Sequence, residues 1–216
     1  MKKKKFREKS DRKSGFIHRL DMGVSFGTDE WQTMDVDVAY IYGYQAGRAF
    51  FFGVGGGLQV QPVFYDYYLS QKYKLDRPFS VSVPLFVEIK SYIMNRKVSP
   101  FIDFRGGYSF GLLDSKLTSS RETEYGTYNT DNLSNRIDSY TKNWEATGKF
   151  AAAGVGLSFK KWDVGVYKFY QYGNYKYETE IERHYNDGSV TTVSEQGKKT
   201  NRHIPVDIQL RASYKF

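Results

Sequence analysis

The sequence contains no cysteine among its 216 residues and only 5 prolines. The absence of cysteine excludes disulfide bonds and thiolate metal sites, although it does not identify a redox compartment. No run approaches the ~18 consecutive apolar residues that a membrane-spanning helix needs, and the mean hydropathy is −0.61. These absences exclude a helical membrane protein. They do not exclude a strand barrel, in which apolar and polar residues alternate.

Glycine and aromatic residues are abundant, with 20 Gly, 19 Tyr and 16 Phe. This composition suits strands that carry large aromatic side chains on the outside of a barrel and little bulk on the inside. No Pro-rich or Gly/Ser-rich linker divides the chain, so we expect a single β domain over residues 16–216, preceded by a basic N-terminal tail over residues 1–15.

The net charge of +8 is concentrated in that tail. Residues 1–15 carry eight Lys and Arg against two Asp and Glu, or +6, which leaves only +2 for residues 16–216. We therefore predict no basic surface on the folded part and no nucleic-acid partner. Charged residues follow the lysine run where a secretory signal would have its apolar stretch, so we expect no export signal within the sequence.

Eight segments alternate apolar and polar residues with a period of two, which indicates strands. Most are close to the roughly 9 to 11 residues that a tilted strand needs to cross a membrane. We predict an all-β fold, a closed antiparallel up-and-down eight-stranded transmembrane barrel, and we expect Pro84 to cause a bulge or gap. The segments are 16–26, 34–44, 50–60, 79–89, 102–112, 149–159, 163–172 and 204–216.

The connections alternate in length. Those over 62–78, 113–147 and 174–202 are long, whereas those near 45–49, 91–99 and 160–162 are short. Outer-membrane barrels place short turns in the periplasm and long loops outside the cell. Residues 174–202 flank a tight-turn sequence at Asn186–Ser189 and predict a projecting hairpin with unpaired edges. The Ser-, Thr- and Asn-rich segment 113–147 is predicted to be a mobile loop.

The polar face of the eight segments consists mostly of small residues and of charges of both signs. Small residues fit the inside of a narrow closed barrel, and enclosed charges must be paired. A wet outer face of a soluble, lipocalin-like ligand-binding barrel is the alternative. We predict a lumen closed by a charge network, with Lys90, Asp163 and Lys215 on the same face. The predicted network is Arg19, Asp21, Asp35, Asp37, Glu88, Asp103, Arg105, Asp207 and Arg211.

Three segments, at residues 80–86, 100–111 and 209–216, make the chain similar to small outer-membrane barrels of the outer membrane protein X and A kind, and among them to PorT-like barrels. The last segment resembles the signal that the barrel-assembly machinery reads, at Gln209, Tyr214 and Phe216, although Arg211 stands where Gly is usual. The resemblance implies a location in the outer membrane of a Gram-negative type of cell, with outer-membrane lipid and that machinery as partners.

The residues offer little chemistry. His184 lies in a segment loosely similar to the His-x-Ser-Asn motif of lipid A deacylase barrels, but Asn186 stands in place of the serine. His18 is expected at the membrane interface and His203 in the lumen or at its rim. We expect no catalytic residues, no metal and no cofactor. We predict a structural, adhesion or surface-binding role through loops 113–147 and 174–202. A lipid-modifying enzyme, a secretion-system component and a channel are the alternatives.

Overall fold

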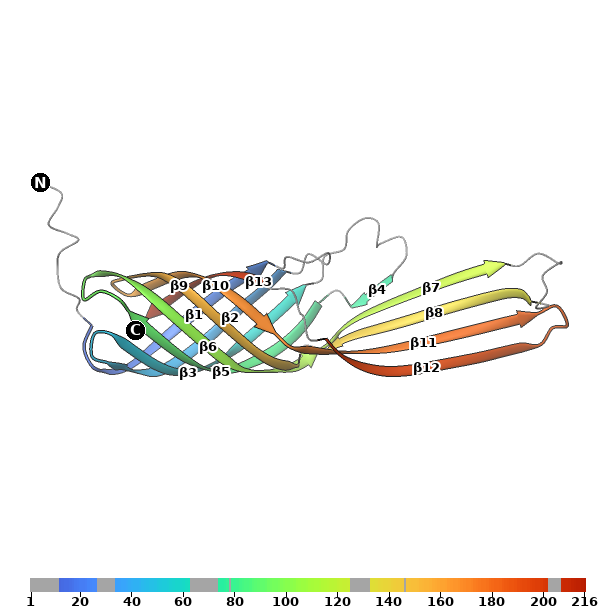
Figure 1. The fold of residues 1–216 in the computed structure, drawn as a ribbon, viewed down its shortest axis with the longest axis horizontal. Coiled ribbons are helices and arrows are strands. Elements are labelled where there is room, and N and C mark those ends of the chain that lie inside the picture. Colours follow the sequence, from blue (N-terminus) through green and yellow to red (C-terminus); the bar gives the residue numbers. More distant parts are fainter. Residues whose placement is uncertain are drawn as a thin grey trace, which may run out of the picture.

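The computed structural model describes residues 12–26, 34–62, 74–77, 79–124, 133–145, 147–201 and 207–216. These residues form thirteen β-strands, arranged as a closed barrel and a separate five-stranded sheet. Figure 1 shows the sheet extending beyond one end of the barrel along its long axis. Across the described ranges, no helix is long and apolar enough to span a membrane.

The barrel is antiparallel and has eight strands, as the alternation predicts. Its closed order is β1-β13-β10-β9-β6-β5-β3-β2, so each strand pairs with its neighbour in the chain among the barrel strands, and β13 closes on β1. The strands are β1 (Gly15–Phe26), β2 (Met34–Ala46), β3 (Phe50–Pro62), β5 (Phe79–Tyr92), β6 (Val98–Leu113), β9 (Gly148–Phe159), β10 (Trp162–Gln171) and β13 (Asp207–Lys215).

The first and last strands close the barrel in a continuous register, from Arg19 opposite Lys215 to Phe26 opposite Ile208. Beyond this ladder, the amide of Phe216 donates to the carbonyl of His18 at 3.0 Å. Residues 204–206 of the predicted terminal strand lie outside the described residues. The side chain of Asp207 also lies outside them.

Three short turns join barrel strands at one end, which we call the turn end: residues 47–49, 93–97 and 160–161. Gly47 has φ 64° and Lys160 has φ 51°. Both torsions belong to the left-handed region, which tight turns use and which is uncommon for a residue with a side chain. The opposite end, where the five-stranded sheet extends, is called the sheet end.

The five-stranded sheet has the order β12-β11-β8-β7-β4. Its strands are β4 (Lys74–Arg77), β7 (Ser115–Glu124), β8 (Leu133–Glu145), β11 (Gly173–Tyr185) and β12 (Val190–Asn201). Only Asp114 separates β6 from β7, and only Tyr172 separates β10 from β11. The sheet is therefore built from direct continuations of barrel strands.

The prediction that 113–147 is a mobile loop is wrong, because β7 and β8 form an antiparallel hairpin within it. β8 also pairs with β11 from Asn174 opposite Glu145 to Tyr185 opposite Leu133. Backbone pairing between the two hairpins stabilises a segment whose side chains carry no apolar alternation. The prediction of a hairpin over 174–202 is confirmed, but only one of its two edges, that of β12, is left unpaired by the described strands.

Side chains alternate in burial along each barrel strand, as in β2, where buried and exposed residues strictly alternate from Asp35 to Gln45. The buried positions face the lumen and are largely polar or charged, whereas the exposed positions are large and apolar. Pro84 lies on the lumen side of β5. The β3–β5 register stops at Gly56 opposite Leu85 and resumes at Gln59 opposite Ser82, so the predicted local gap is present.

Candidate functional site

The centre of the lumen is occupied by Glu88, which is 1% exposed and projects from β5. Arg19 donates to one oxygen of this carboxylate. The other oxygen, Oε1, lies 3.2 Å from Lys90 Nζ and 3.5 Å from Arg105 Nη2. Three cations from three strands therefore share one buried carboxylate. Such an arrangement is stable only because each cation also has a second acidic neighbour.

Towards the turn end, Asp163 provides the second carboxylate for this cluster. Its Oδ2 lies 3.1 Å from Lys90 Nζ and 3.5 Å from Arg19 Nη1, and it accepts a hydrogen bond from the Tyr92 hydroxyl at 3.2 Å. Its Oδ1 lies 2.5 Å from Lys215 Nζ. The charge of Asp163 is thereby neutralised by side chains from β1, β5 and β13.

Towards the sheet end, Arg105 and Arg211 share Asp21. Arg105 donates to Asp21, and the Arg211 Nε donates to Asp21 Oδ2 at 3.1 Å. The Arg211 Nη1 donates to Asp37 Oδ2 and to Gln209 Oε1, each at 3.0 Å. Arg211, the departure from the assembly-signal pattern, therefore fills the lumen and links β13 to β1 and β2.

Beyond Arg211 the lumen is lined by neutral polar side chains and Asp35. Gln59 donates to Asp35 Oδ2 at 3.1 Å and accepts from the Ser82 hydroxyl at 3.4 Å. The Ser109 hydroxyl donates to Ser82 Oγ at 2.9 Å. The lumen therefore changes from a dense ionic cluster to a hydrogen-bonded layer along its axis.

Aromatic rings fill the remaining space beside the cations. The Arg19 guanidinium lies 4.0 Å from the ring centroid of Phe51, and Lys90 Nζ lies 4.5 Å from that of Phe101. Such contacts add cation–π attraction in a site without bulk water. Glycines opposite these rings provide the room. A Cβ placed on Gly154 would overlap the ring of Tyr167.

The filled lumen leaves a cavity of about 20 Å³ among Asp37, Gln59, Arg105 and Arg211 and the rings around them. A single water needs on the order of 10–15 Å³. In the described part of the barrel, this cavity has room for about one water and none for a ligand or a stream of ions. The arrangement closes the barrel and holds its strands in register.

Eight of the nine residues in the predicted network lie together in the lumen: Arg19, Asp21, Asp35, Asp37, Glu88, Asp103, Arg105 and Arg211. The ninth, Asp207, has its side chain outside the described residues. The network also includes Lys90, Asp163 and Lys215, which the sequence places on the same polar face among the charges paired by sign. Their sign and their position on that face are the signal that identifies them.

The aromatic side chains inside the lumen differ from the prediction. Phe51, Phe86, Phe101 and Tyr167 are buried inside the barrel, although aromatic side chains were expected outside. The sequence does contain a signal: three consecutive phenylalanines at 50–52 must place the middle one on the face opposite its neighbours. A large ring on a face otherwise rich in glycine indicates that the ring fills the space that the glycines leave.

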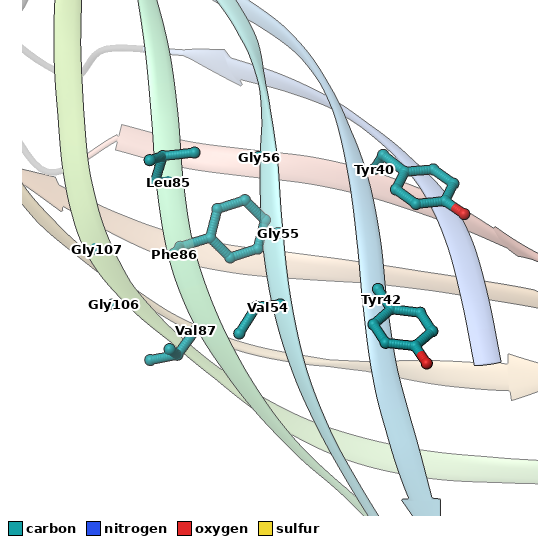
Figure 2. Close-up of a pocket in the computed structure, with 10 residues that line it drawn as sticks. All are labelled: Tyr40, Tyr42, Val54, Gly55, Gly56, Leu85, Phe86, Val87, Gly106 and Gly107. Carbon is teal, nitrogen blue, oxygen red and sulfur yellow. The ribbon is translucent and has the colours of Figure 1, made fainter. Parts of the chain in front are cut away.

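The outer face of the barrel is an apolar belt. Val54, Leu85 and Val87 are each at least half exposed, at 58%, 50% and 57%. A hollow of about 610 Å³ lies among these side chains, Tyr40 and Tyr42, with Gly56 and Gly106 in its lining. Figure 2 shows the hollow between strands, with the two tyrosines on one side and Leu85 and Val87 on the other. Its lining carries no charged side chain.

The two histidines in the described residues lie far apart in the chain. His18 is exposed on β1, where its ring contacts Tyr40 and Tyr42 on the outer face near the turn end. His184 Nε2 lies 3.0 Å from Glu182 Oε1, on β11 of the sheet. His203 lies outside the described residues. Among the described residues, no group of three or more His, Cys, Asp or Glu is arranged to hold a metal ion.

The tip of the β11–β12 hairpin is held by a short polar turn. Asp187 Oδ1 accepts hydrogen bonds from the Ser189 amide at 2.8 Å and from the Ser189 hydroxyl at 2.6 Å. These hydrogen bonds lower the pKa of the Asp187 carboxyl, the hydroxyl contributing most. Gly188, at φ 83°, completes the turn. Beyond it, the side chains of residues 190–196 on β12 are exposed.

No protein-family model matches the sequence, and no curated protein matches it. Two solved structures show weak similarity to this chain. A major outer membrane protein from Thermus thermophilus has 12% identity and a TM-score of 0.43, over 94% of this chain and 100% of that one. OprB of Pseudomonas putida, in a low-pH structure, has 11% identity and a TM-score of 0.20, over 94% of this chain and 92% of that one.

The first of these is described as an outer membrane protein, but the identities and TM-scores of both structures are too low for them to carry an argument about what this chain does. The resemblance to PorT-like barrels and to outer membrane proteins X and A stays a prediction. The assembly signal also stays a prediction. In the structure, Gln209 is buried in the lumen, Tyr214 packs against Trp162 on the neighbouring strand, and Phe216 contacts Tyr214.

Proposed function

We propose that this chain is an integral outer-membrane β-barrel that holds a rigid sheet outside the cell and binds extended segments of other proteins along the β12 edge. The lumen supports the membrane location. Five cations and six carboxylates are enclosed in the barrel, while its outer face is apolar. A barrel surrounded by water would gain nothing from enclosing its charged side chains and exposing its apolar ones. This distribution therefore favours lipid as the surroundings of the barrel.

The closed lumen argues against the alternatives that need interior space. A lipocalin-like barrel needs a ligand cavity, and a channel needs a continuous opening. The lumen cavity near Arg211 has room for about one water. Transport and ligand storage therefore receive no support from the described residues. We propose a non-enzymatic role, and the competing hypotheses are a lipid-modifying activity at His184 and a place in a secretion system.

The observation that carries the binding role is the free edge of β12. This strand has 12 residues, pairs with β11 along one side, and has no described partner on the other. Unpaired amides and carbonyls on such an edge can add a strand from another chain. Its exposed half, Val190 to Gln196, has a single charge, at Glu195. Natural edge strands that avoid association usually carry more charge, especially lysine, which β12 has only beyond this half, at Lys198 and Lys199.

The experiment uses the folded protein in detergent micelles and a displayed library of extended peptides. Selected peptides are expected to bind the wild type and to lose binding in Val193→Lys, because an edge lysine opposes strand addition. The matched control is Thr179→Lys, which adds the same charge to the central strand β11. Equal binding to wild type and Val193→Lys would exclude the β12 edge as the binding site.

A further inference from the structure

The charged side chains of the three turns at the turn end are all positive. The three turns contain five Lys and Arg and no Asp or Glu: Arg48, Arg96, Lys97, Lys160 and Lys161. Arg48, Arg96, Lys160 and Lys161 are exposed, and Lys97 is half-buried. The prediction that the folded part has no basic surface is therefore wrong. The net charge of residues 16–216 does not reveal this cluster of cations, because the carboxylates that offset it lie mostly in the lumen and in the sheet.

Arg12 joins two of these three turns. Its Nη2 donates to the Met94 carbonyl at 2.7 Å, and its Nε donates to the Arg48 carbonyl at 3.2 Å. Its guanidinium carbon lies 4.2 Å from the ring centroid of Tyr92. Partial burial lowers the pKa of this guanidinium, but an arginine stays charged at neutral pH. Arg12 thus links two of the turns and adds a sixth cation.

Asp163, the acid of the ionic cluster placed towards the turn end, attracts the Arg12 guanidinium, but it is also shared by Lys90, Lys215 and Arg19. The two long segments at the opposite end have a slight excess of negative charge when they are taken together. The segment 113–147 contains four Lys and Arg against six Asp and Glu, and 173–202 contains five against five. The molecule is therefore electrically polarised along the barrel axis.

Aromatic side chains on the outer face lie directly beside the cations. Phe16 stacks on Tyr42 with ring centroids 5.4 Å apart, and Trp162 contacts Tyr214 at 5.0 Å. Lys161 Nζ lies 5.5 Å from the centroid of Tyr214. Aromatic belts mark the level of lipid headgroups in membrane proteins. The lysines and arginines of the turns are consequently at the depth of the phosphate groups.

We propose that this basic rim, formed by Arg12, Arg48, Arg96, Lys97, Lys160 and Lys161, binds the headgroups of anionic phospholipids in the leaflet at the turn end. The inference rests on the membrane location proposed above. Because short turns of outer-membrane barrels lie on the periplasmic side, that leaflet is the inner one. Cations near an anionic surface attract its lipids electrostatically, and salt screens the attraction.

The test measures quenching of Trp162, which lies at the rim, by brominated lipids. The other two tryptophans, Trp31 and Trp144, are replaced by Phe, and the full chain is refolded into phosphatidylcholine bilayers. Roughly 30% of the lipid is replaced with a brominated lipid, which gives a surface charge comparable to that of a natural membrane when this lipid is phosphatidylglycerol. Comparing the quenching by brominated phosphatidylglycerol with that by brominated phosphatidylcholine gives the relative affinity for the two headgroups. Phosphatidylglycerol should be preferred by roughly fivefold, as for one fully engaged cation.

The key variant changes Arg48, Arg96, Lys97, Lys160 and Lys161 to Gln, and it should lose the preference. The control changes five cations in the sheet sequence to Gln, Lys116, Arg136, Lys142, Lys176 and Arg183, and it should keep the preference. Loss of the preference in 1 M salt would support an electrostatic contact. A preference that persists in the turn variant, or is absent from the wild type, would overturn the proposal.

Heat-modifiability on a detergent gel is measured on each refolded sample. A barrel that inserts into both bilayers without headgroup preference would overturn the basic-rim proposal and leave the membrane location intact. A chain that inserts into neither bilayer and stays monomeric in buffer without detergent would overturn the membrane location, and the rim proposal with it.

Discussion

The barrel and the external sheet are built from strands of similar length, with β2 and β11 both having 13 residues, yet they are held together differently. The barrel buries Glu88, Arg105 and their partners and exposes its apolar residues. The sheet has exposed polar side chains on β12, and it is stabilised mainly by backbone pairing between its own strands. The barrel therefore depends on long-range ionic contacts, and the sheet on backbone pairing between its strands.

The largest effect should come from removing the central carboxylate. Glu88→Gln leaves Arg19, Lys90 and Arg105 without their shared partner, so the barrel should lose roughly 3–5 kcal/mol of unfolding free energy. Urea unfolding in micelles, followed by the gel shift on heating, measures the loss. Glu180→Gln is the control on the exposed sheet and should change stability by less than about 0.5 kcal/mol. Equal effects of the two substitutions would contradict the ionic role of Glu88.

A smaller effect is expected from filling the space beside a lumen ring. Gly154→Ala forces the Tyr167 ring to move, and overpacking of this kind costs roughly 1–3 kcal/mol. In Gly106→Ala the new Cβ would meet only the Phe150 carbonyl, at 4.0 Å, so this control should be close to neutral. The same unfolding measurement compares the two. If both variants unfold alike, the lumen side of Gly154 is less tightly packed than the structure indicates.

Removing the outer hairpin should affect the barrel still less. Deletion of residues 176–200 should change the unfolding free energy of the barrel by no more than about 0.5 kcal/mol, since distant sites act independently. Binding of peptides selected for the β12 edge should be lost. Gel migration before and after boiling reports the first quantity, and peptide capture the second. A barrel that fails to assemble without this hairpin would show that the two regions fold as one unit.

The smallest effect is confined to the hairpin tip and depends on pH. The hydrogen bonds from Ser189 lower the pKa of Asp187. Their stabilisation is therefore present above the ordinary aspartate pKa of about 4 and is lost as the pH falls through the lowered value. Amide exchange at Ser189 should accelerate over that range in the wild type. Asp187→Asn should remove this pH dependence, and an unchanged profile in the variant would contradict the assignment to Asp187.

Much of the barrel is predictable because each strand separates an apolar face from a polar face. That alternation locates all eight strands and places Asp21, Glu88 and Arg211 on the inner side. The hairpin at 174–202 is predictable from Asn186–Ser189, since that turn sequence forces a reversal. The pairing of β7 and β8 is not, because polar strands held by backbone hydrogen bonds leave little periodic trace in the sequence.

The contacts inside the lumen also exceed what the sequence can specify. The alternation assigns the charged residues of the barrel strands to the inner face. Which of them form ion pairs, such as Asp163 with Lys90 and Lys215, depends on the stagger between strands. The basic rim was missed for a related reason. A summed charge treats Glu88 and Arg48 alike, although one is neutralised in the lumen and the other projects from a turn.

The sequence by itself determined the eight barrel strands and their two faces, because a period of two in side-chain polarity is a local property of each segment. Only the tertiary structure decided the rest: the ionic cluster around Glu88, the sheet that leaves β12 as a long free edge, and the basic rim fastened by Arg12. These features join residues far apart in the chain, and their distances are set by barrel closure and strand stagger.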